Sequence, residues 1–386
     1  MNIVLVNTAH VIDSKGGGER VLCDMANALT ERGHKVTVVC CEIKQGRPGF
    51  ELLDTVDFIN AWNRPVSWYQ KGVAAKLRSL SLSSRERKRK RALVQADFYG
   101  TKIRRALAQS EPDIFICFQL NSALAIKKAY GKRIPIITML HCNPIIFPIL
   151  DVLSDEVSQL GLIQVLLPEY AQTVRRKVPD ARVTSIPNCV PQYEQTSPLS
   201  APVLINIGRI VPWKRQHLAV EAFALINKRF PEWRLELWGG TDGKGTYLAQ
   251  LVDRIRELGL QDRVRLCGVT DEVHQRYLDA SIFVFPSNHE GFPLALTEAM
   301  SCGLAVVGCR TSSGVNSLIR DEENGLLVDA TPEGFAHAME RLMSDPSLCA
   351  RLGAQAHESM KDYRAASLWN RWERLISDEG ARHKAA

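Results

Sequence analysis

NIVLVNT (residues 2–8) and KVTVVC (residues 35–40) flank a glycine turn and a stretch with helical spacing from about Glu19 to Arg32, which Gly33 ends. Both apolar runs are continuous, which is typical of parallel strands in a sheet that helices cover on both faces. The first forty residues therefore predict a β-α-β unit, and this unit sets the fold class that the rest of the chain follows.

The same alternation of short apolar runs and amphipathic stretches continues along the chain. A polar, proline-bearing stretch, PQYEQTSPLSAP (191–202), interrupts it and is the best candidate for a linker. We therefore predict an α/β protein with two doubly wound parallel-sheet domains, residues 1–195 and 196–364, which face a deep ligand-binding cleft. The further predicted strands are DIFICFQ (113–119), IPIITMLH (134–141), LIQVLLP (162–168), VTSIPN (183–188), VLINIGR (203–209), RLELWGG (234–240), RVRLCG (263–268), IFVFPS (282–287), LAVVGCR (304–310) and GLLVD (325–329).

Composition limits the classes of protein that remain. The 386 residues are 45% hydrophobic and 24% charged, the balance of a soluble globular enzyme that is too long for one core. No apolar run reaches about 18 residues and the N-terminus lacks a signal-peptide pattern, so we expect a cytoplasmic protein without a membrane span. The ten cysteines form no C-x-x-C motif and no cluster with histidine, so we expect reduced cysteines and no metal site.

The formal net charge of +7 is concentrated in the first half of the chain. Residues 1–197 carry 27 Lys and Arg against 18 Asp and Glu, a net +9, whereas residues 198–386 carry 22 against 24, a net −2. The excess is densest between Lys71 and Arg105. There, six residues form what we term the basic cluster: Arg85, Arg87, Lys88, Arg89, Lys90 and Arg91.

The basic cluster has three interpretations. Apolar residues precede it at Val73, Leu77, Leu80 and Leu82, which favours an interfacial helix that binds an anionic membrane surface or an anionic acceptor. A plain solvated face is the alternative. A nucleic-acid surface is the least favoured interpretation, because no nucleic-acid-binding motif accompanies the charge.

Two loops that leave predicted strands carry groups suited to phosphate. KGGGER (15–20) precedes a helix whose unpaired N–H groups attract anions, although a turn without a ligand is the alternative and the motif is not G-x-G-x-x-G. GRIVPWK (208–214) follows a strand with two cations, Arg209 and Lys214, which would stabilise the growing charge of a diphosphate leaving group. The chain has no D-x-D motif, which favours protein cations over a metal for this work.

SNHEGFPLALTEAM (287–300) is the most specific motif. It places Glu290 on a loop at a strand end and Glu298 on the helix that follows. The two carboxylates can reach separate parts of a long ligand, such as the hydroxyls of a sugar and of a ribose, while N–H groups from Gly291 through Leu294 face phosphate. His141 ends the strand IPIITMLH, and from position alone a lone histidine is more often structural than catalytic.

At these residues the sequence resembles the retaining glycosyltransferases of family 4, which have the GT-B fold of two Rossmann-like domains. The resemblance covers nearly the whole chain. The C-terminal SLWNRWERLI resembles the helix that in this family crosses back onto the first domain, so we expect residues from about 365 to 386 to pack there. The matching motifs are the loop Gly16-Gly17-Gly18, IGRIVPWKRQHLAVEAF, RVRLCGVTDEV, the E-x7-E element EGFPLALTEA, and ENGLLVD.

The resemblance implies a role for each matched residue. Arg209 and Lys214 would hold the donor diphosphate, and Glu298 the ribose. Glu290 would contact the donor sugar near the anomeric carbon, and His141 would reach the transferred sugar as a hydrogen-bonding catalytic-site residue. The remaining implied donor-binding residues are Gly16, Gly17, Gly18, Gly208, Val269 beside the base, and Gly291, Phe292, Pro293 and Leu294 near sugar and phosphate.

The resemblance also implies a metal-independent, retaining hexosyltransferase whose only co-substrate is a nucleotide-diphosphate sugar, with UDP favoured and GDP second. No carboxylate in these motifs is placed as a glycosidase-type nucleophile, so we expect front-face transfer in which the leaving phosphate helps deprotonate the acceptor. The expected acceptor is a glycan or lipid-linked intermediate of cell-envelope polysaccharide or lipopolysaccharide synthesis, at the inner face of the cytoplasmic membrane.

Two positions depart from the family pattern. Cys189 replaces the usual glycine after SIPN, which puts the local hinge turn in doubt, and Ser317 stands where an acidic residue is common, which weakens any inference about donor specificity. The alternatives within the same architecture are a sugar-nucleotide epimerase, which would need further acid/base residues, and a phosphorylase, which would normally be longer and carry a pyridoxal lysine. A non-catalytic sugar-nucleotide-binding subunit is the third alternative, but it has no reason to keep this set of residues.

Overall fold

The computed structural model describes residues 1–62 and 83–385, except residues 147, 242 and 244. The chain divides into two compact units. Unit 1 comprises Met1–Asn188 and Ala366–Ala386, and unit 2 comprises Cys189–Ala365. Each unit has its own parallel sheet and its own covering helices.

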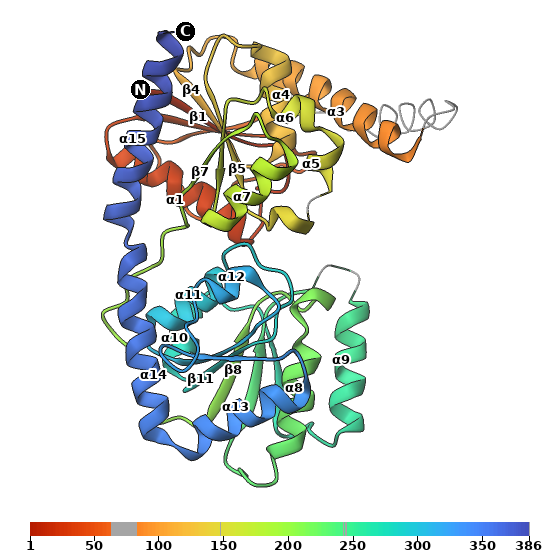
Figure 1. Ribbon diagram of the computed structural model, residues 1–386, viewed down its shortest axis with the longest axis vertical. Coiled ribbons are helices and arrows are strands. Elements are labelled where there is room, and N and C mark those ends of the chain that lie inside the picture. The colour runs from red at the N-terminus through yellow and green to blue at the C-terminus, as the bar shows by residue number, and fades with distance from the viewer. Residues whose placement is uncertain (63–82, 147, 242, 244, 386) are drawn as a thin grey trace. The chain divides into compact units, whose positions relative to one another are not determined.

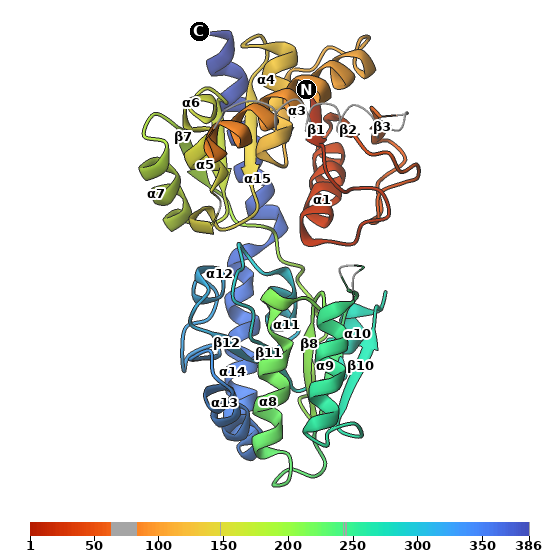
Figure 2. The same cartoon turned by 90° about the vertical axis from the view of Figure 1, so that its right-hand side faces the viewer.

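Unit 1 is built on a seven-stranded parallel sheet in the order β3-β2-β1-β4-β5-β6-β7, with helices on both of its faces (Figures 1 and 2). Its strands are β1 (Asn2–Asn7), β2 (Lys35–Cys40), β3 (Asp57–Asn60), β4 (Ile114–Cys117), β5 (Ile136–Leu140), β6 (Leu162–Val165) and β7 (Arg182–Ser185). Its helices are α1 (Gly17–Glu31), α3 (Ser84–Ala106), α4 (Leu120–Tyr130), α5 (Ile149–Val152), α6 (Ser154–Val157), α7 (Pro168–Lys177) and α15 (Ala365–Lys384), with a 3-10 turn η1 (Pro144–Ile146).

Unit 2 is built on a six-stranded parallel sheet in the order β10-β9-β8-β11-β12-β13. Its strands are β8 (Val203–Ile207), β9 (Arg234–Trp238), β10 (Val264–Gly268), β11 (Ile282–Phe285), β12 (Ala305–Cys309) and β13 (Leu326–Val328). Its helices are α8 (Gln216–Ile226), α9 (Thr246–Glu257), α10 (Val273–Leu278), α11 (Leu294–Ser301), α12 (Ser313–Asn316), α13 (Pro332–Ser344) and α14 (Pro346–Ser359), with 3-10 turns η2 (Pro212–Lys214) and η3 (Met360–Tyr363).

The predicted α/β fold with two doubly wound sheets is confirmed. The continuous apolar runs are buried strands because helices cover both sheet faces, as β4 illustrates with four fully buried residues. The sequence does not predict β3. This strand lies at the edge of the sheet and pairs only with β2, and its residues are exposed or half-buried, so it has no continuous apolar run.

The strand order reverses at one place in each sheet. In unit 1 the chain runs outward from β1 to β3 and then returns to β4 on the other side of β1, and in unit 2 it does the same at β8 and β11. Ligands of doubly wound sheets bind beyond the carboxyl ends of the strands at such a switch point. The loops after β8 and β11 are therefore the place to look for a site in unit 2.

The stretch 191–202, interpreted from sequence as a linker, lies in unit 2. Gln192 Nε2 donates a hydrogen bond to the Met360 carbonyl at 3.0 Å. The Ser197 N–H donates to the Cys302 carbonyl at 2.8 Å. These bonds attach the stretch to the helices of unit 2, which a polar, proline-bearing composition does not reveal.

Helix α15 returns to unit 1 at its second residue. An Arg371 guanidinium nitrogen donates to the Ser185 carbonyl at 2.9 Å, and Glu379 forms an ion pair with Arg182 beside the start of β7. His383 Nε2 lies 2.9 Å from the Arg133 carbonyl. Side chains along most of the helix therefore bind the loops and strand ends of unit 1.

The structure also bears on the cysteines, on membrane-spanning helices and on the predicted interfacial helix. All ten cysteines are free thiols, and seven of them are buried. Among the helices that the structure describes, none is long and apolar enough to cross a bilayer. The apolar positions of the predicted interfacial helix, Val73, Leu77, Leu80 and Leu82, lie outside the described residues.

Gly100 allows α3 to approach α4 closely. A Cβ at this position would lie 2.5 Å from the carbonyl oxygen of Ala125, a backbone atom that cannot move away without shifting α4. We predict that Gly100→Ala lowers the free energy of unfolding by about 1–3 kcal/mol, although alanine is the better helix former. Differential scanning calorimetry measures this change as a lower Tm.

Gly18 in α1 is the matched control, because a Cβ there meets no atom within 4 Å. Gly18→Ala is expected to keep or raise the Tm, since alanine favours a helix over glycine by about 1 kcal/mol. Equal Tm values for the two variants would show that close packing at Gly100 is unimportant.

Candidate functional site

The carboxyl edge of the unit 2 sheet carries an ion pair between two loops. Lys214 ends the 3-10 turn that follows β8, and Glu290 lies in the loop after β11, so the pair spans the switch point. Lys214 Nζ lies 2.6 Å from Glu290 Oε1, and the two side chains are only 18% and 12% exposed. Because so little water reaches these charges, each needs the other or a ligand of equivalent charge.

Neighbouring groups hold Glu290 in place. The Ser287 hydroxyl donates a hydrogen bond to Glu290 Oε1, the oxygen that Lys214 also contacts. The Glu290 N–H donates to Ser312 Oγ at 3.1 Å. A Cβ on Gly314 would lie 2.6 Å from the Glu290 carbonyl oxygen, so α12 packs directly against this backbone.

The loop after β8 presents Arg209 at the same edge. Gly208 and Gly239 are in close contact, because a Cβ on Gly239, whose φ is +146°, would lie 2.0 Å from the Gly208 carbonyl oxygen. Gln216 is fully buried and donates from Nε2 to the Arg209 carbonyl at 2.9 Å. The Arg209 guanidinium lies over the ring of Trp213, 5.6 Å from its centroid.

Sequence reasoning missed three residues that shape these loops. Ser287 is the last residue of the predicted strand IFVFPS (282–287) and lies three residues before Glu290, and this position was a usable signal. Ser312 comes from another strand-to-helix loop, and Gln216 begins a helix, so neither carried one. Their importance arises from contacts between segments that lie far apart in the sequence.

Glu298 lies in α11 and is 5% exposed. Its Oε2 atom accepts a hydrogen bond from the Tyr277 hydroxyl at 3.2 Å. The second carboxylate of the E-x7-E element is thus as enclosed as the first. It also has a fixed hydrogen-bond donor.

The residues between the two carboxylates are placed as follows. Pro293 is the N-cap of α11 and has no N–H, so the backbone donors around the helix start are those of Gly291, Phe292 and Leu294. The Phe292 ring is 5% exposed and packs against Tyr363, with ring centroids 5.3 Å apart. The Phe292 side chain therefore belongs to the core of unit 2, and only its backbone is available to a ligand.

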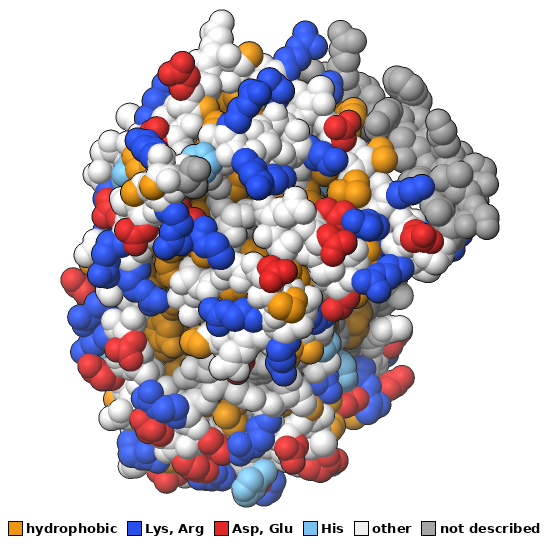
Figure 3. Space-filling model, turned by 45° about the horizontal axis from the view of Figure 1, so that its top comes forward, with side chains coloured by type: hydrophobic (Ala, Val, Ile, Leu, Met, Phe, Trp, Pro, Cys, Tyr) orange, Lys and Arg blue, Asp and Glu red, His pale blue; other side chains and the backbone are white. Residues whose placement is uncertain are grey.

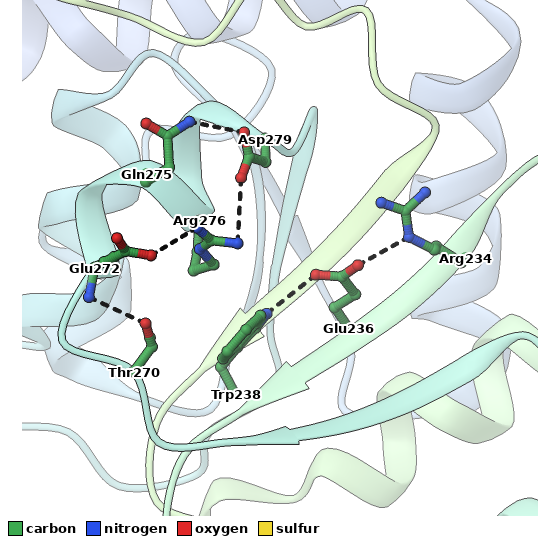
Figure 4. A network of polar contacts seen from close by, with 8 residues as sticks. All are labelled: Arg234, Glu236, Trp238, Thr270, Glu272, Gln275, Arg276 and Asp279. Atoms are coloured by element: carbon green, nitrogen blue, oxygen red, sulfur yellow. Dashed lines mark hydrogen bonds and ion pairs between the residues drawn. The ribbon is translucent and has the colours of Figure 1, made fainter.

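Val269 follows β10 and is 67% exposed. Beside it, the Glu272 N–H donates to Thr270 Oγ1 at 3.0 Å, and Glu272 pairs with Arg276 at 3.0 Å. The Arg276 guanidinium lies over the ring of Trp238, 5.6 Å from its centroid (Figure 4). The loop that carries Val269 is thus fastened to α10 and β9.

His141 follows β5 in unit 1, and its ring stacks on Phe118 with centroids 5.3 Å apart and planes 14° apart. Its Nε2 atom is buried and has no hydrogen-bond partner among the described residues. Burial lowers the pKa of His141 to about 4. The imidazole is therefore neutral at neutral pH, with one ring nitrogen available to a ligand.

The glycine loop lies at the start of α1 in unit 1. Gly16 is the N-cap, and Gly17 and Gly18 begin the helix. None of the three has a positive φ. A Cβ on Gly16 would lie 2.2 Å from Glu19 Oε2, so the Glu19 carboxylate folds back over the helix start, the end of a helix that favours negative charge.

The basic cluster occupies the N-terminal half of α3, and all six side chains are exposed. Arg85 donates to the Asp151 carbonyl at 2.5 Å, and Arg89 Nε donates to Glu156 at 2.8 Å, which ties α3 to α5 and α6. Within the described part of the chain, no ion pair involves Arg87, Lys88, Lys90 or Arg91.

A groove of about 440 Å³ lies between the C-terminal parts of α3 and α4. These helix ends lie at the amino edge of the sheet, away from the edge at which doubly wound sheets bind ligands. The groove is therefore separate from the motif residues. Its lining residues are Asp97, Thr101, Arg104, Arg105, Ala108, Lys128 and Ala129.

The structure brings Gly208, Arg209, Lys214 and Glu290 to the carboxyl edge of unit 2. Glu298 lies on the helix that follows, and His141 and the glycine loop lie in unit 1. Over residues 1–62 and 83–385, apart from 147, 242 and 244, no group of three or more His, Cys, Asp or Glu side chains is arranged to hold a metal ion. The charged groups at the unit 2 edge suit an anionic ligand that also carries hydroxyls, because cations and carboxylates lie side by side.

Two protein-family models match the chain. Residues 15–192 match Glycosyltransferase Family 4, and residues 193–359 match Glycosyl transferases group 1. The two matches adjoin and together extend from residue 15 to residue 359.

Among curated proteins, a lipopolysaccharide core biosynthesis glycosyltransferase of Rhizobium meliloti is 28% identical over 357 residues, which are 89% of this chain and 91% of that protein. An exopolysaccharide phosphotransferase of Streptomyces coelicolor is 34% identical over 200 residues, or 51% of this chain. The chain spans only 21% of that second relative's length.

Solved structures share the architecture over the whole chain. Sucrose-phosphate synthase from Thermosynechococcus elongatus superimposes with a TM-score of 0.81 at 19% identity and covers 99% of both chains. Anabaena HepE in complex with UDP and glucose gives a TM-score of 0.75 at 19% identity, over 98% of this chain and 99% of that one. These likenesses show the common fold.

We predict that His141, which is neutral and whose Nε2 atom is buried, makes the protein less stable as the pH falls. Unfolded histidine binds a proton near pH 6.5, whereas folded His141 does so only near pH 4. The unfolded state binds more protons between these values, so stability present above pH 6.5 is lost through that window, by at most about 2 kcal/mol at about pH 5. Urea unfolding at neutral and mildly acid pH measures the loss.

His141→Gln cannot titrate, so its stability should depend less on pH over the same window. The comparison within each protein cancels any constant effect of the substitution. If His141→Gln loses as much unfolding free energy between neutral and mildly acid pH as the wild-type protein does, a group other than His141 causes the loss.

Proposed function

The chain belongs to the glycosyltransferases of family 4, with the GT-B fold, and on that premise we propose that it moves a sugar from a nucleotide-diphosphate sugar to a glycan or lipid-linked acceptor with retention of anomeric configuration. The observation that carries the proposal is the enclosed Lys214–Glu290 pair beside Arg209 at the switch point of unit 2. Two cations and a carboxylate at one strand edge suit a ligand in which a diphosphate adjoins a sugar.

Lys214 and Arg209 act on the leaving group in this proposal. A diphosphate gains negative charge as its bond to the anomeric carbon breaks, so cations already aimed at it stabilise the transition state more than the ground state. Arg209 offers a planar fork and Lys214 a point charge. With both cations supplied by the protein, we propose that the transfer requires no metal ion.

Glu290 exchanges partners when the donor binds. Phosphate oxygens replace its carboxylate at Lys214, and the carboxylate then accepts hydrogen bonds from hydroxyls of the donor sugar. The Ser287 hydroxyl keeps it oriented during this exchange. Glu290 is thus a binding group near the anomeric carbon, and the departing phosphate takes the proton of the acceptor hydroxyl on the same face of the sugar.

UDP is the favoured nucleotide, and GDP the second. Anabaena HepE shares the fold, and its crystal structure is in complex with UDP and glucose. Glu298 would accept hydrogen bonds from the ribose hydroxyls, and exposed Val269 would lie beside the base. His141, neutral and with its Nε2 unpartnered among the described residues, would donate or accept a hydrogen bond at the transferred sugar.

The proposed acceptor belongs to the synthesis of cell-envelope polysaccharide or lipopolysaccharide. Support comes from the Rhizobium meliloti relative, a lipopolysaccharide core glycosyltransferase whose length the chain nearly spans. Such acceptors are carried on lipids, so an enzyme that acts on them must approach a membrane surface.

We predict that Lys214→Ala and Glu290→Gln each lower kcat at least about 100-fold while the protein stays folded, because each removes a contact that strengthens in the transition state. Glu221→Gln is the matched control, since it breaks a 2.8 Å ion pair to Arg254 between α8 and α9 of the same unit. Transfer from UDP-glucose and GDP-mannose to a lipopolysaccharide core acceptor measures kcat, and NMR of the product gives its anomeric configuration.

Calorimetric titration with UDP, GDP, ADP and TDP, with and without EDTA, separates binding from turnover. Binding of one nucleotide that EDTA leaves unchanged supports a diphosphate site built from protein cations. Loss of binding in EDTA contradicts metal independence, and an inverted product contradicts front-face transfer. If no nucleotide binds, the donor proposal fails.

We further propose that the basic cluster binds an anionic membrane, which places the enzyme on the inner face of the cytoplasmic membrane. Figure 3 shows Lys and Arg side chains distributed over the side of unit 1 that faces the viewer. Within the cluster, Arg85 and Arg89 bind other parts of unit 1, whereas the other four side chains are exposed and form no ion pair with a described residue. Four such charges attract an anionic leaflet by about 1 kcal/mol each.

Replacing Arg87, Lys88, Lys90 and Arg91 together by Gln should weaken binding to vesicles that contain phosphatidylglycerol at least about tenfold at low salt. Hydrolysis of the donor without acceptor should stay unchanged. The matched control replaces Lys127, Lys128, Lys132 and Arg133 by Gln, which removes the same charge from the end of α4. Equal losses in both variants would assign the binding to overall charge and not to the cluster.

A further inference from the structure

Tyr277 is a fully buried tyrosine in α10 whose hydroxyl reaches the second carboxylate of the site. It is 0% exposed, and its hydroxyl lies 3.0 Å from the Ala295 carbonyl oxygen and 3.2 Å from Glu298 Oε2. Both acceptors belong to α11. One hydroxyl therefore joins α10 to the turn of α11 that carries Glu298.

The ring and the hydroxyl of Tyr277 have different tasks. The ring packs edge-to-face on Phe283 of β11, with centroids 5.9 Å apart, and a phenylalanine would make the same contact. Burial, and then the charge of Glu298, raise the pKa of Tyr277 well above its ordinary value, so the hydroxyl keeps its proton and remains a donor. Its single proton is shared between the Ala295 carbonyl and Glu298 Oε2, and the hydroxyl is needed only for these two acceptors.

Helix α10 is held firmly enough to fix this donor. On its outer side Arg276 pairs with Glu272 and Asp279 and lies over the ring of Trp238 (Figure 4). On another side, the His274 ring stacks on Tyr193 of the stretch 191–202, with centroids 4.0 Å apart and planes 13° apart. The helix has only six residues, so these contacts and not its own hydrogen bonds fix its place.

We propose that Tyr277 is the positioning residue for Glu298 and sets the affinity of the site for the ribose hydroxyls of the donor nucleotide. This inference rests on the proposed function, in which Glu298 binds the ribose. The Tyr277 hydroxyl holds Oε2 and so selects one orientation of the carboxylate before the donor arrives. A carboxylate that is oriented in advance loses less freedom when it accepts hydrogen bonds from a diol.

Titrations with UDP and with 2′,3′-dideoxy-UDP test the proposal. Wild-type protein should bind UDP more tightly than the dideoxy nucleotide by at least about tenfold, since a carboxylate–hydroxyl hydrogen bond is lost. Tyr277→Phe should weaken UDP binding at least about fivefold and leave dideoxy-UDP binding unchanged. In a Glu298→Gln background, Tyr277→Phe should have little further effect, because its influence acts through Glu298.

Tyr247→Phe is the matched control, because the Tyr247 hydroxyl bonds His217 at 2.9 Å and does not contact Glu298. This variant should keep the wild-type preference for UDP. Two results for Tyr277→Phe would overturn the proposal. If the variant keeps its Tm but binds both nucleotides more weakly by the same factor, Tyr277 has a structural role. If the variant keeps the wild-type preference for UDP over dideoxy-UDP, Tyr277 does not act on ribose binding. Wild-type protein that binds neither nucleotide would instead overturn the proposed function, and this inference with it.

Discussion

The ion pair between Lys214 and Glu290 is the interaction on which the site depends. It joins the loops after β8 and β11, the two strands that meet at the switch point of the second sheet, and both charges are largely withdrawn from water. Removing one partner would leave the other enclosed without its opposite charge, and for buried ion pairs such a loss costs several kcal/mol, about 3–5 in measured cases. A diphosphate that takes over Lys214 while a sugar takes over Glu290 satisfies both charges at once, whereas either group alone satisfies only one. The pair thus favours a ligand in which the two groups are joined.

The fold is readable from the sequence because parallel strands covered by helices must be apolar without interruption. That requirement identifies the central strands, such as β1, β4 and β11. The strands β7, β9 and β10 are interrupted by polar residues and are recognised by shorter apolar patterns, and β3, at the sheet edge, has no buried residue and is missed. The sequence also singles out two carboxylates and two cations of unit 2 as candidates, since they lie in the loop and helix segments that follow apolar strands. Ser287, Ser312, Gln216 and Tyr277 are not, although each holds a motif residue in place. Hydrogen bonds between distant loops leave no periodic pattern, so only the folded structure reveals them.

The glycines also show that a conspicuous sequence pattern and an important tertiary contact can occur at different residues. The run Gly16-Gly17-Gly18 stands out in the sequence, yet none of its members has a positive φ, and Gly18 has open space around it. Gly239, in contrast, is inconspicuous in the sequence but allows the Gly208 carbonyl to approach within a distance that any Cβ would forbid. The conformation of the loop that carries Arg209 and Lys214 therefore depends on a residue some thirty positions away along the chain.

The charges that would bind the donor and the charges that would attract an anionic surface lie in different parts of the chain. The basic excess lies in residues 1–197, whereas unit 2 (residues 189–365), which supplies Arg209, Lys214, Glu290 and Glu298, carries 18 Lys and Arg against 22 Asp and Glu, a net charge of −4. A diphosphate is therefore not drawn to unit 2 by a general positive field. It must be held by the two cations that lie at the strand edge, and hydrogen bonds fix both the loop of Arg209 and the carboxylate beside Lys214. Because screening by salt weakens long-range fields more than enclosed contacts, donor binding at unit 2 should depend on salt less than binding of the basic cluster to an anionic surface.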